Sequence, residues 1–224
     1  MSSVEATQRA EARREAAPAA VVLLGVFVVL AVVSRSQDWA LLGFPWWAWL
    51  ILGAPALLLT VDLAAARRGA GLVQTRRAAI ALLWLLAAGN AGALLILVLG
   101  LVTTSTADLG GGELLLTGFA IYSADVIVFG LMFWELEAGG PLARSREERG
   151  GPVDFRFPQD DSPAPWHPRV WDYLYVSVTN AIAFSPTDTM PLSLRAKAVM
   201  GFESLLSAVT VLLVAARAVN VLGS

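Results

Sequence analysis

Residues 170–221 read VWDYLYVSVTNAIAFSPTDTMPLSLRAKAVMGFESLLSAVTVLLVAARAVNV. The first part, Val170–Ala183, is apolar but shorter than the roughly 20 helical residues that cross a bilayer, and Ser185–Pro191 ends it sharply. The last part, Ser193–Val221, is long enough to cross with some tilt. This order predicts a helix that enters the membrane partway and turns back before a full span. A short amphipathic helix lying on the membrane surface is the alternative for residues 170–190.

The composition is that of a membrane protein. Of 224 residues, 57% are hydrophobic and 15% are charged, and the mean hydropathy is +0.65. One soluble core cannot hide the apolar side chains as this sequence arranges them. The alternating stretches of about 10 residues that build an outer-membrane barrel are absent from the sequence. These observations exclude a soluble enzyme and a β-barrel.

Long apolar runs predict the membrane spans. They cover about 16–34, 46–65, 78–102, 114–136 and 193–221. The sequence therefore predicts an all-α integral membrane protein with five transmembrane helices plus one re-entrant pore-type half-helix before the last span. The first run could be mistaken for a signal peptide, but no A-x-A-like cleavage site follows Val33, so we expect a retained helix.

We expect one membrane domain with three regions. These are a charged tail (1–15), a three-helix N-terminal membrane region (16–113) and a helix–linker–pore loop–helix module (114–224) whose linker covers 137–169. Eight of the 11 prolines lie between Gly140 and Pro191 among many charged residues, which favours an extended linker over a further span.

The arginines predict the orientation. With five spans, the tail, the connector 66–77 and the linker lie on one face and hold three, four and five arginines, whereas the other face has only Arg35 and Arg217. By the positive-inside rule that arginine-rich face is cytoplasmic. We expect a multi-pass protein of the cell (inner) membrane with a cytoplasmic N-terminus.

The sequence lacks the usual residues of catalysis and metal binding. It has no cysteine and one histidine, His167, which excludes disulfides, thiolate metal sites and His-pair metal motifs. Intramembrane hydrolysis would need a Ser–His pair or two facing aspartates within the spans. We therefore expect no enzymatic activity, no cofactor, no metal site and no nucleic-acid partner.

Two segments resemble a known pore module. WDYLYVSVTN from Trp171 and FSPTDTMPLS from Phe184, followed by the closing helix, look like the pore loop of two-transmembrane potassium channels. They are more similar still to an uncharacterised family of bacterial integral membrane proteins, a domain of unknown function with a WDFLYFSFT…SD element before its last helix. In this resemblance Asp188 and Pro191 keep the channel spacing, and Thr179 takes the place of a pore-helix threonine.

The filter glycines of such channels have no counterpart here. Ala183-Phe184-Ser185 or Ser185-Pro186-Thr187 stands where the channel has Gly-Tyr-Gly. Because Ala, Ser and Pro resist the left-handed conformations that aim successive carbonyls at an ion, the resemblance supports a pore-loop fold more than potassium selectivity. The filter-like candidates are Thr179, Asn180, Ala183, Phe184, Ser185, Pro186, Thr187 and Asp188.

Ionisable groups also occur within the predicted spans. Asp125 lies near the middle of its span, where an acid costs about 2.5–3.5 kcal/mol, so it should face the bundle and have a partner. Tyr122, Ser123 and Asn90 are the candidate partners. A second polar stripe at helical spacing consists of Glu203, Ser207 and Thr210. These residues predict either a proton or cation path or a structural hydrogen-bonded cluster.

The leading hypothesis is passive conduction of monovalent cations through a homotetramer in the lipid bilayer, with weak selectivity between potassium and sodium. One pore loop and two helices per subunit enclose nothing alone, which is why we expect a tetramer. A non-conducting, channel-like scaffold, sensor or complex subunit is the alternative that the missing glycines favour. A proton-coupled carrier would use Asp125 and Glu203, but the sequence shows no inverted repeat.

Overall fold

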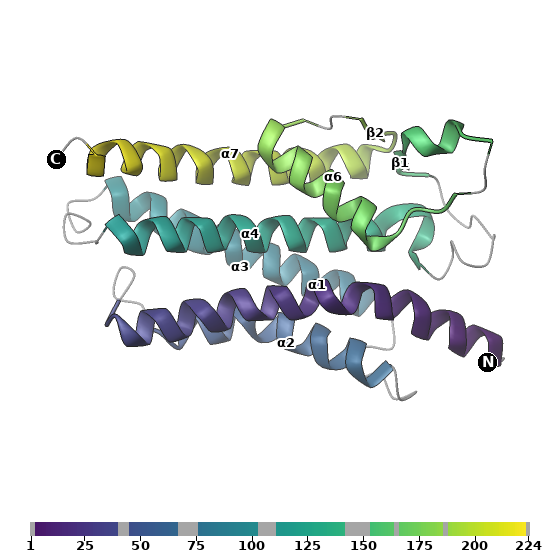
Figure 1. Ribbon diagram of the computed structural model, residues 1–224, viewed down its shortest axis with the longest axis horizontal. Helices are drawn as coiled ribbons and strands as arrows, with labels where there is room; N and C mark the ends of the chain where they lie inside the picture. The colour runs from purple at the N-terminus through teal and green to yellow at the C-terminus, as the bar shows by residue number, and fades with distance from the viewer. Residues whose placement is uncertain are drawn as a thin grey trace.

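The computed structural model describes residues 3–39, 45–66, 76–102, 111–141, 153–163, 166–185 and 188–222. Over these residues the architecture is helical, with one short pair of strands (Figure 1). The elements are α1 (Ser3–Ser36), α2 (Ala48–Ala66), α3 (Arg76–Val102), α4 (Gly111–Leu136), the 3₁₀ helix η2 (Glu137–Gly139), β1 (Phe155–Arg156), the 3₁₀ helix η3 (Pro158–Asp161), α6 (Val170–Ala183), β2 (Met190–Pro191) and α7 (Leu194–Leu222).

Within the described residues, four helices are long and apolar enough to cross a membrane. The segments are Arg14–Ser36, Arg76–Leu99, Gly112–Gly139 and Leu194–Ala216, and a shorter apolar segment, Ala48–Ala64, lies in α2. Large apolar side chains such as Val32, Leu85 and Leu212 are exposed on these helices. Hydrocarbon rather than water suits such a surface. The helices are those of a multi-pass membrane protein.

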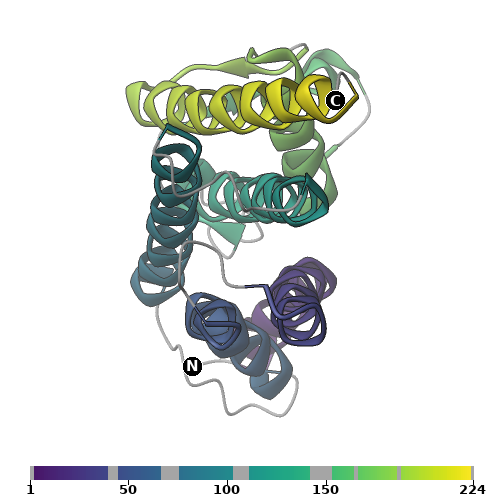
Figure 2. The same cartoon turned by 90° about the vertical axis from the view of Figure 1, so that its left-hand side faces the viewer.

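Helix α4 is at the centre of the bundle. It contacts α1, α3, α6 and α7, and Figure 2 shows it between α1 and α7, with α1 and α2 packed side by side. Helix α1 begins at Ser3, so the segment expected to be a charged tail continues the first helix. Its alanines, glutamates and arginines have high helix propensity, which accounts for this extension.

Two glycines let other helices approach α4 closely. A Cβ added at Gly130 would lie 2.9 Å from the Leu174 Cα atom of α6, and one added at Gly118 would lie 2.6 Å from a Val214 methyl of α7. Small residues at such crossings replace side-chain bulk with backbone contact.

Helix α6 follows an unusual path. It begins at the end of the molecule where α4 ends, runs obliquely across the bundle and stops partway along α7, where Asn180 contacts Met200 and Glu203 (Figure 1). Phe184, with φ 55°, is left-handed and ends the helix. The chain returns to β2 at the end where α6 began, and β2 pairs antiparallel with β1 through Phe155 opposite Pro191 and Arg156 opposite Met190.

Aromatic rings hold the described part of the linker onto the helices. The Phe155 ring lies between Phe133 of α4 and Tyr173 of α6, with centroid distances of 5.3 and 6.1 Å. Phe157 contacts Tyr173 and Trp166 at 5.4 and 5.3 Å. Residues 153–163 are therefore packed over the starting end of α6, which fixes where that helix enters the bundle.

Candidate functional site

Helix α6 has one polar and one apolar side. Ser177 and Asn180, three residues apart and so on one face, are fully buried against α4 and α7. The opposite side is apolar and exposed, and consists of Trp171, Tyr175, Val178 and Ile182. The helix thus turns its polar groups into its own subunit and its apolar groups outward.

Glu203 of α7 meets the polar side of α6. Asn180 donates from Nδ2 to Glu203 Oε2 at 2.6 Å and to the Met200 carbonyl at 3.0 Å. The Ser177 hydroxyl contacts Glu203 Oε1 and also the Val126 carbonyl of α4, at 2.7 Å. Ser204 donates to Asn180 Oδ1 at 3.1 Å. We call Ser177, Asn180, Glu203 and Ser204 the α6 anchor, because they join α6 to α7.

Asp125 of α4 faces the bundle interior, as the sequence predicts, with 1% of its surface exposed. Among the candidate partners, Asn90 of α3 donates to Asp125 Oδ1 at 3.0 Å, whereas Ser123 bonds the Phe119 carbonyl of its own helix. The second oxygen, Oδ2, has no hydrogen-bond partner among the described residues. The Asp125 and Glu203 carboxyl groups lie close enough to interact electrostatically.

The polar stripe of α7 is buried along its length. Glu203 and Ser207 have no exposed surface, and Thr210 has 1%. Thr210 donates to the Leu206 carbonyl at 2.8 Å, which satisfies its hydroxyl within the helix. The Ser207 hydroxyl has no hydrogen-bond partner among the described residues. The stripe therefore leads from the α6 anchor to an unsatisfied hydroxyl one turn further along α7.

The filter-like candidates divide into two groups. Asn180 belongs to the buried α6 anchor, and the Thr179 hydroxyl is satisfied by the Tyr175 and Val176 carbonyls of its own helix, both at 3.0 Å. The residues at the end of α6 are instead exposed on the single chain: Ala183, Phe184, Ser185 and Asp188. Pro186 and Thr187 lie outside the described residues.

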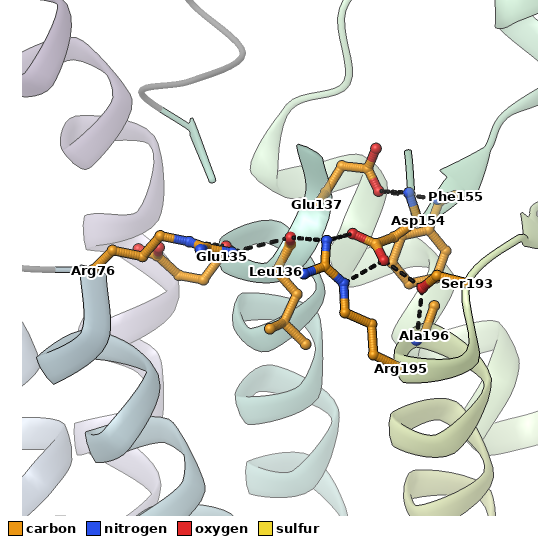
Figure 3. A network of polar contacts seen from close by, with 9 residues as sticks. All are labelled: Arg76, Glu135, Leu136, Glu137, Asp154, Phe155, Ser193, Arg195 and Ala196. Atoms are coloured by element: carbon orange, nitrogen blue, oxygen red, sulfur yellow. Dashed lines mark hydrogen bonds and ion pairs between the residues drawn. The ribbon is translucent and has the colours of Figure 1, made fainter. Parts of the chain in front are cut away.

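A second polar cluster lies at the end of the bundle where α6 and α7 begin (Figure 3). Asp154, fully buried, accepts from Arg195 Nε at 2.6 Å and from the Ser193 hydroxyl. Glu137 accepts from the backbone N–H groups of Asp154 and Phe155 at 3.0 and 2.9 Å. These contacts, which we call the linker clamp, hold the described linker between the end of α4 and the start of α7.

Arg76 and Arg195 tie further elements to the same place. Arg76, in the first turn of α3, donates to the carbonyls of Glu135 and Leu136 at 2.8 and 3.1 Å, and Arg195 reaches the Leu136 carbonyl at 3.3 Å. Cations near helix carbonyl ends are stabilising, because those carbonyls lack helical partners. Glu137 is buried in this structural role.

Sequence reasoning passed over the buried residues Ser177 and Asp62 and the half-buried Ser204. Ser177 could have been found, since it lies three residues before Asn180 on the same helical face. Ser204 gave no signal, because a serine beside the buried stripe of α7 is ordinary. Asp62 is an acid inside the apolar helix α2 and is 3% exposed. Its position in an apolar run could have predicted an intramembrane acid.

No protein-family model, no curated protein and no solved structure matches this chain. The assignment of function therefore depends on the residues described above, and the resemblance to pore-loop proteins remains a prediction.

Proposed function

We propose that this chain is a pore-loop membrane protein that passes small monovalent cations as a homotetramer. The observation that carries the proposal is the path of α6 and of the chain after it. The helix starts at one end of the bundle and stops partway along α7, and the chain then returns to the same end (Figure 1). In a bilayer this path makes α6 a re-entrant half-helix. Polar backbone at that depth is tolerated where it is buried in protein or lines a watery cavity.

The proposal counts α2 as a fifth span. Its 19 residues would extend about 28 Å at 1.5 Å per residue, close to the roughly 30 Å of the hydrocarbon core. The start of α3, the end of α4 and the starts of α6 and α7 then share one face with the N-terminus (Figure 1). Since the arginine-rich segments belong to that face, we place it in the cytoplasm and the protein in the cell (inner) membrane.

The end of α6 is the part of each chain that a pore would use. The α6 anchor fixes the inner side of the helix and leaves Ala183, Phe184, Ser185 and Asp188 exposed. Four copies of Asp188 around an axis would attract cations and disfavour anions. Without filter glycines, the discrimination between potassium and sodium should be weak.

A specific observation favours the non-conducting alternative. The outward side of α6 is apolar, with Trp171, Tyr175 and Ile182 exposed, and such a side chain pattern suits lipid or a partner helix better than water. In that case the re-entrant unit would serve a scaffold, a sensor or a subunit of a larger complex.

Measurement of oligomeric mass and ion flux separates these functions. Purified protein in mild detergent should be tetrameric, and reconstituted vesicles should pass potassium and sodium at similar rates. Asp188→Asn should reduce the flux, whereas Asp161→Asn, which removes an exposed acid of η3, should not. A monomeric mass would contradict the pore hypothesis. Vesicles that contain verified tetramers but show no ion flux would favour the non-conducting alternative.

A further inference from the structure

Two polar atoms without a hydrogen-bond partner among the described residues lie at the same level of the α4–α7 contact. Gly118 lies against Val214, and the rings of Phe129 and Phe202 are 6.0 Å apart, so the two helices run antiparallel in a fixed register. Moving seven residues forward from Gly118 and seven back from Val214 reaches Asp125 and Ser207 (118 + 7 = 125, 214 − 7 = 207). Asp125 and Ser207 are therefore at the same level of the bundle.

Both side chains are buried, and each has an oxygen without a hydrogen-bond partner among the described residues. Asp125 is 1% exposed and Ser207 has no exposed surface. Asp125 Oδ2 and Ser207 Oγ each lack a hydrogen-bond partner among the described residues. An unpaired buried hydroxyl or carboxyl oxygen is costly, and here an acid and a neutral hydroxyl are left unpaired at the same level of the bundle.

The hydrogen bonds of the α6 anchor bear on whether the neighbouring acid, Glu203, carries a proton. The Ser177 oxygen is within hydrogen-bond reach of both Glu203 Oε1 and the Val126 carbonyl. A serine hydroxyl carries one hydrogen, and the carbonyl can only accept. When Ser177 donates to Val126, Glu203 must donate to Ser177, which requires a protonated and neutral Glu203. In that arrangement Asp125 is the carboxylate of the pair that is left to bear charge.

The apolar helical segments contain no basic residue that could balance that charge. The sequence has no Lys, Arg or His within the apolar helical segments 16–34, 48–66, 78–99, 112–134, 170–183 and 198–216. Arg195 acts in the linker clamp, and Arg76 binds the Glu135 carbonyl at the same end of the bundle. Besides Asp125, the titratable group of α4 that interacts with Glu203 is Tyr122, which is neutral at ordinary pH.

We propose that Asp125 and Ser207 form an intramembrane binding site for one monovalent cation, either an alkali ion or a proton. The Asp125 carboxylate supplies the charge, the Ser207 hydroxyl supplies a neutral oxygen, and Asn90 orients the carboxylate from the far side. Oxygen donors of this kind suit hard cations. The site lies within one chain, so it does not depend on a tetramer or on a pore at its axis.

Thermal unfolding in detergent tests the site with lithium, sodium and potassium chloride added separately to a choline chloride buffer at constant ionic strength. An alkali-ion site should raise Tm saturably for at least one of the ions, because a ligand that binds only the folded state stabilises it. Asp125→Asn should abolish the effect, and Ser207→Ala should weaken the apparent affinity roughly tenfold. The control Asp188→Asn should keep the wild-type response.

Infrared spectroscopy tests whether the site binds a proton instead of an alkali ion. If none of the three ions raises Tm, a protonated-carboxyl band at neutral pH that disappears in Asp125→Asn identifies the proton. If Asp125→Asn does not fold, the readout is instead a shift of the protonated-carboxyl band in Ser207→Ala. The proposal is wrong if the wild type shows neither an ion effect nor such a band, or if an ion effect is unchanged in both variants. Silent vesicles or a monomeric mass would leave these results untouched.

Discussion

The α1–α2 pair and the α4–α6–α7 group pack in different ways. The α1–α2 contact is mainly apolar, with Leu23, Ala56 and Leu59 buried, and Thr60 adds one hydrogen bond to the Ala20 carbonyl at 3.2 Å. The α4–α6–α7 group is joined by the α6 anchor. Apolar packing has no direction, whereas hydrogen bonds admit one register. The difference indicates that the C-terminal half holds a specified arrangement and that the N-terminal pair supports it.

The largest effect should come from removing the centre of the α6 anchor. Glu203→Ala leaves a cavity and removes the acceptor of Asn180, and should lower the free energy of unfolding by about 3 kcal/mol. Glu203→Gln keeps the shape and the acceptor, so it should cost no more than about 1 kcal/mol. Thermal unfolding of both variants in detergent measures the difference. Equal stability of Glu203→Ala and wild type would mean that the anchor does not hold α6.

A somewhat smaller effect is expected in the linker clamp. Arg195→Ala leaves the fully buried Asp154 without its cation, which should cost about 2 kcal/mol. Lys197→Ala removes an exposed cation two residues further along the same helix and should change stability by less than about 0.5 kcal/mol. If the two variants unfold alike, the clamp contributes no more than an ordinary surface charge.

The next largest loss of stability should come from a glycine at which the backbones of α4 and α6 lie close together. Gly130→Ala would press a methyl group against the Leu174 backbone and should cost about 1–2 kcal/mol. The matched control is Gly201→Ala on α7, because a Cβ there meets nothing within 4 Å. That variant should be neutral or slightly stabilising, since alanine favours the helix. Similar losses at both glycines would contradict the close α4–α6 crossing.

The smallest effect is expected in the apolar pair. Leu23→Met keeps the volume of a fully buried side chain of α1 and should cost less than about 1 kcal/mol. The same unfolding assay applies. A loss as large as that of Glu203→Ala would show that the α1–α2 contact is as strictly specified as the α6 anchor.

Much of the fold follows from apolar length and from sequence breakers. The long runs predicted where helices lie, and the short run Val170–Ala183 with its polar ending predicted a short α6 with the observed bounds. The helical start of α1 at Ser3 was not predicted, because a charged, alanine-rich segment is equally compatible with a solvated tail. Alanine propensity and continuity with the first span decide for the helix.

The candidate site was predictable only where helical periodicity operates. Glu203, Ser207 and Thr210 share a face by spacing alone, and Asp125 had to face inward because of its cost in lipid. The linker clamp could not be predicted, because Asp154 and Arg195 are 41 residues apart and their meeting depends on how the linker folds back. That Asp125 and Ser207 lie at the same level of the bundle likewise depends on the α4–α7 register, which the sequence does not give.

The central claim, that α6 enters the membrane and returns on the same side, is tested most directly by labelling single cysteines in this cysteine-free chain. His167→Cys and Leu192→Cys flank the α6 segment at exposed positions, and Arg77→Cys and Gln37→Cys mark the two ends of the bundle. With a membrane-impermeant maleimide, the account predicts that positions 167, 192 and 77 label only in inverted vesicles and that position 37 labels only in right-side-out vesicles. Labelling of positions 167 and 192 from opposite sides would contradict it.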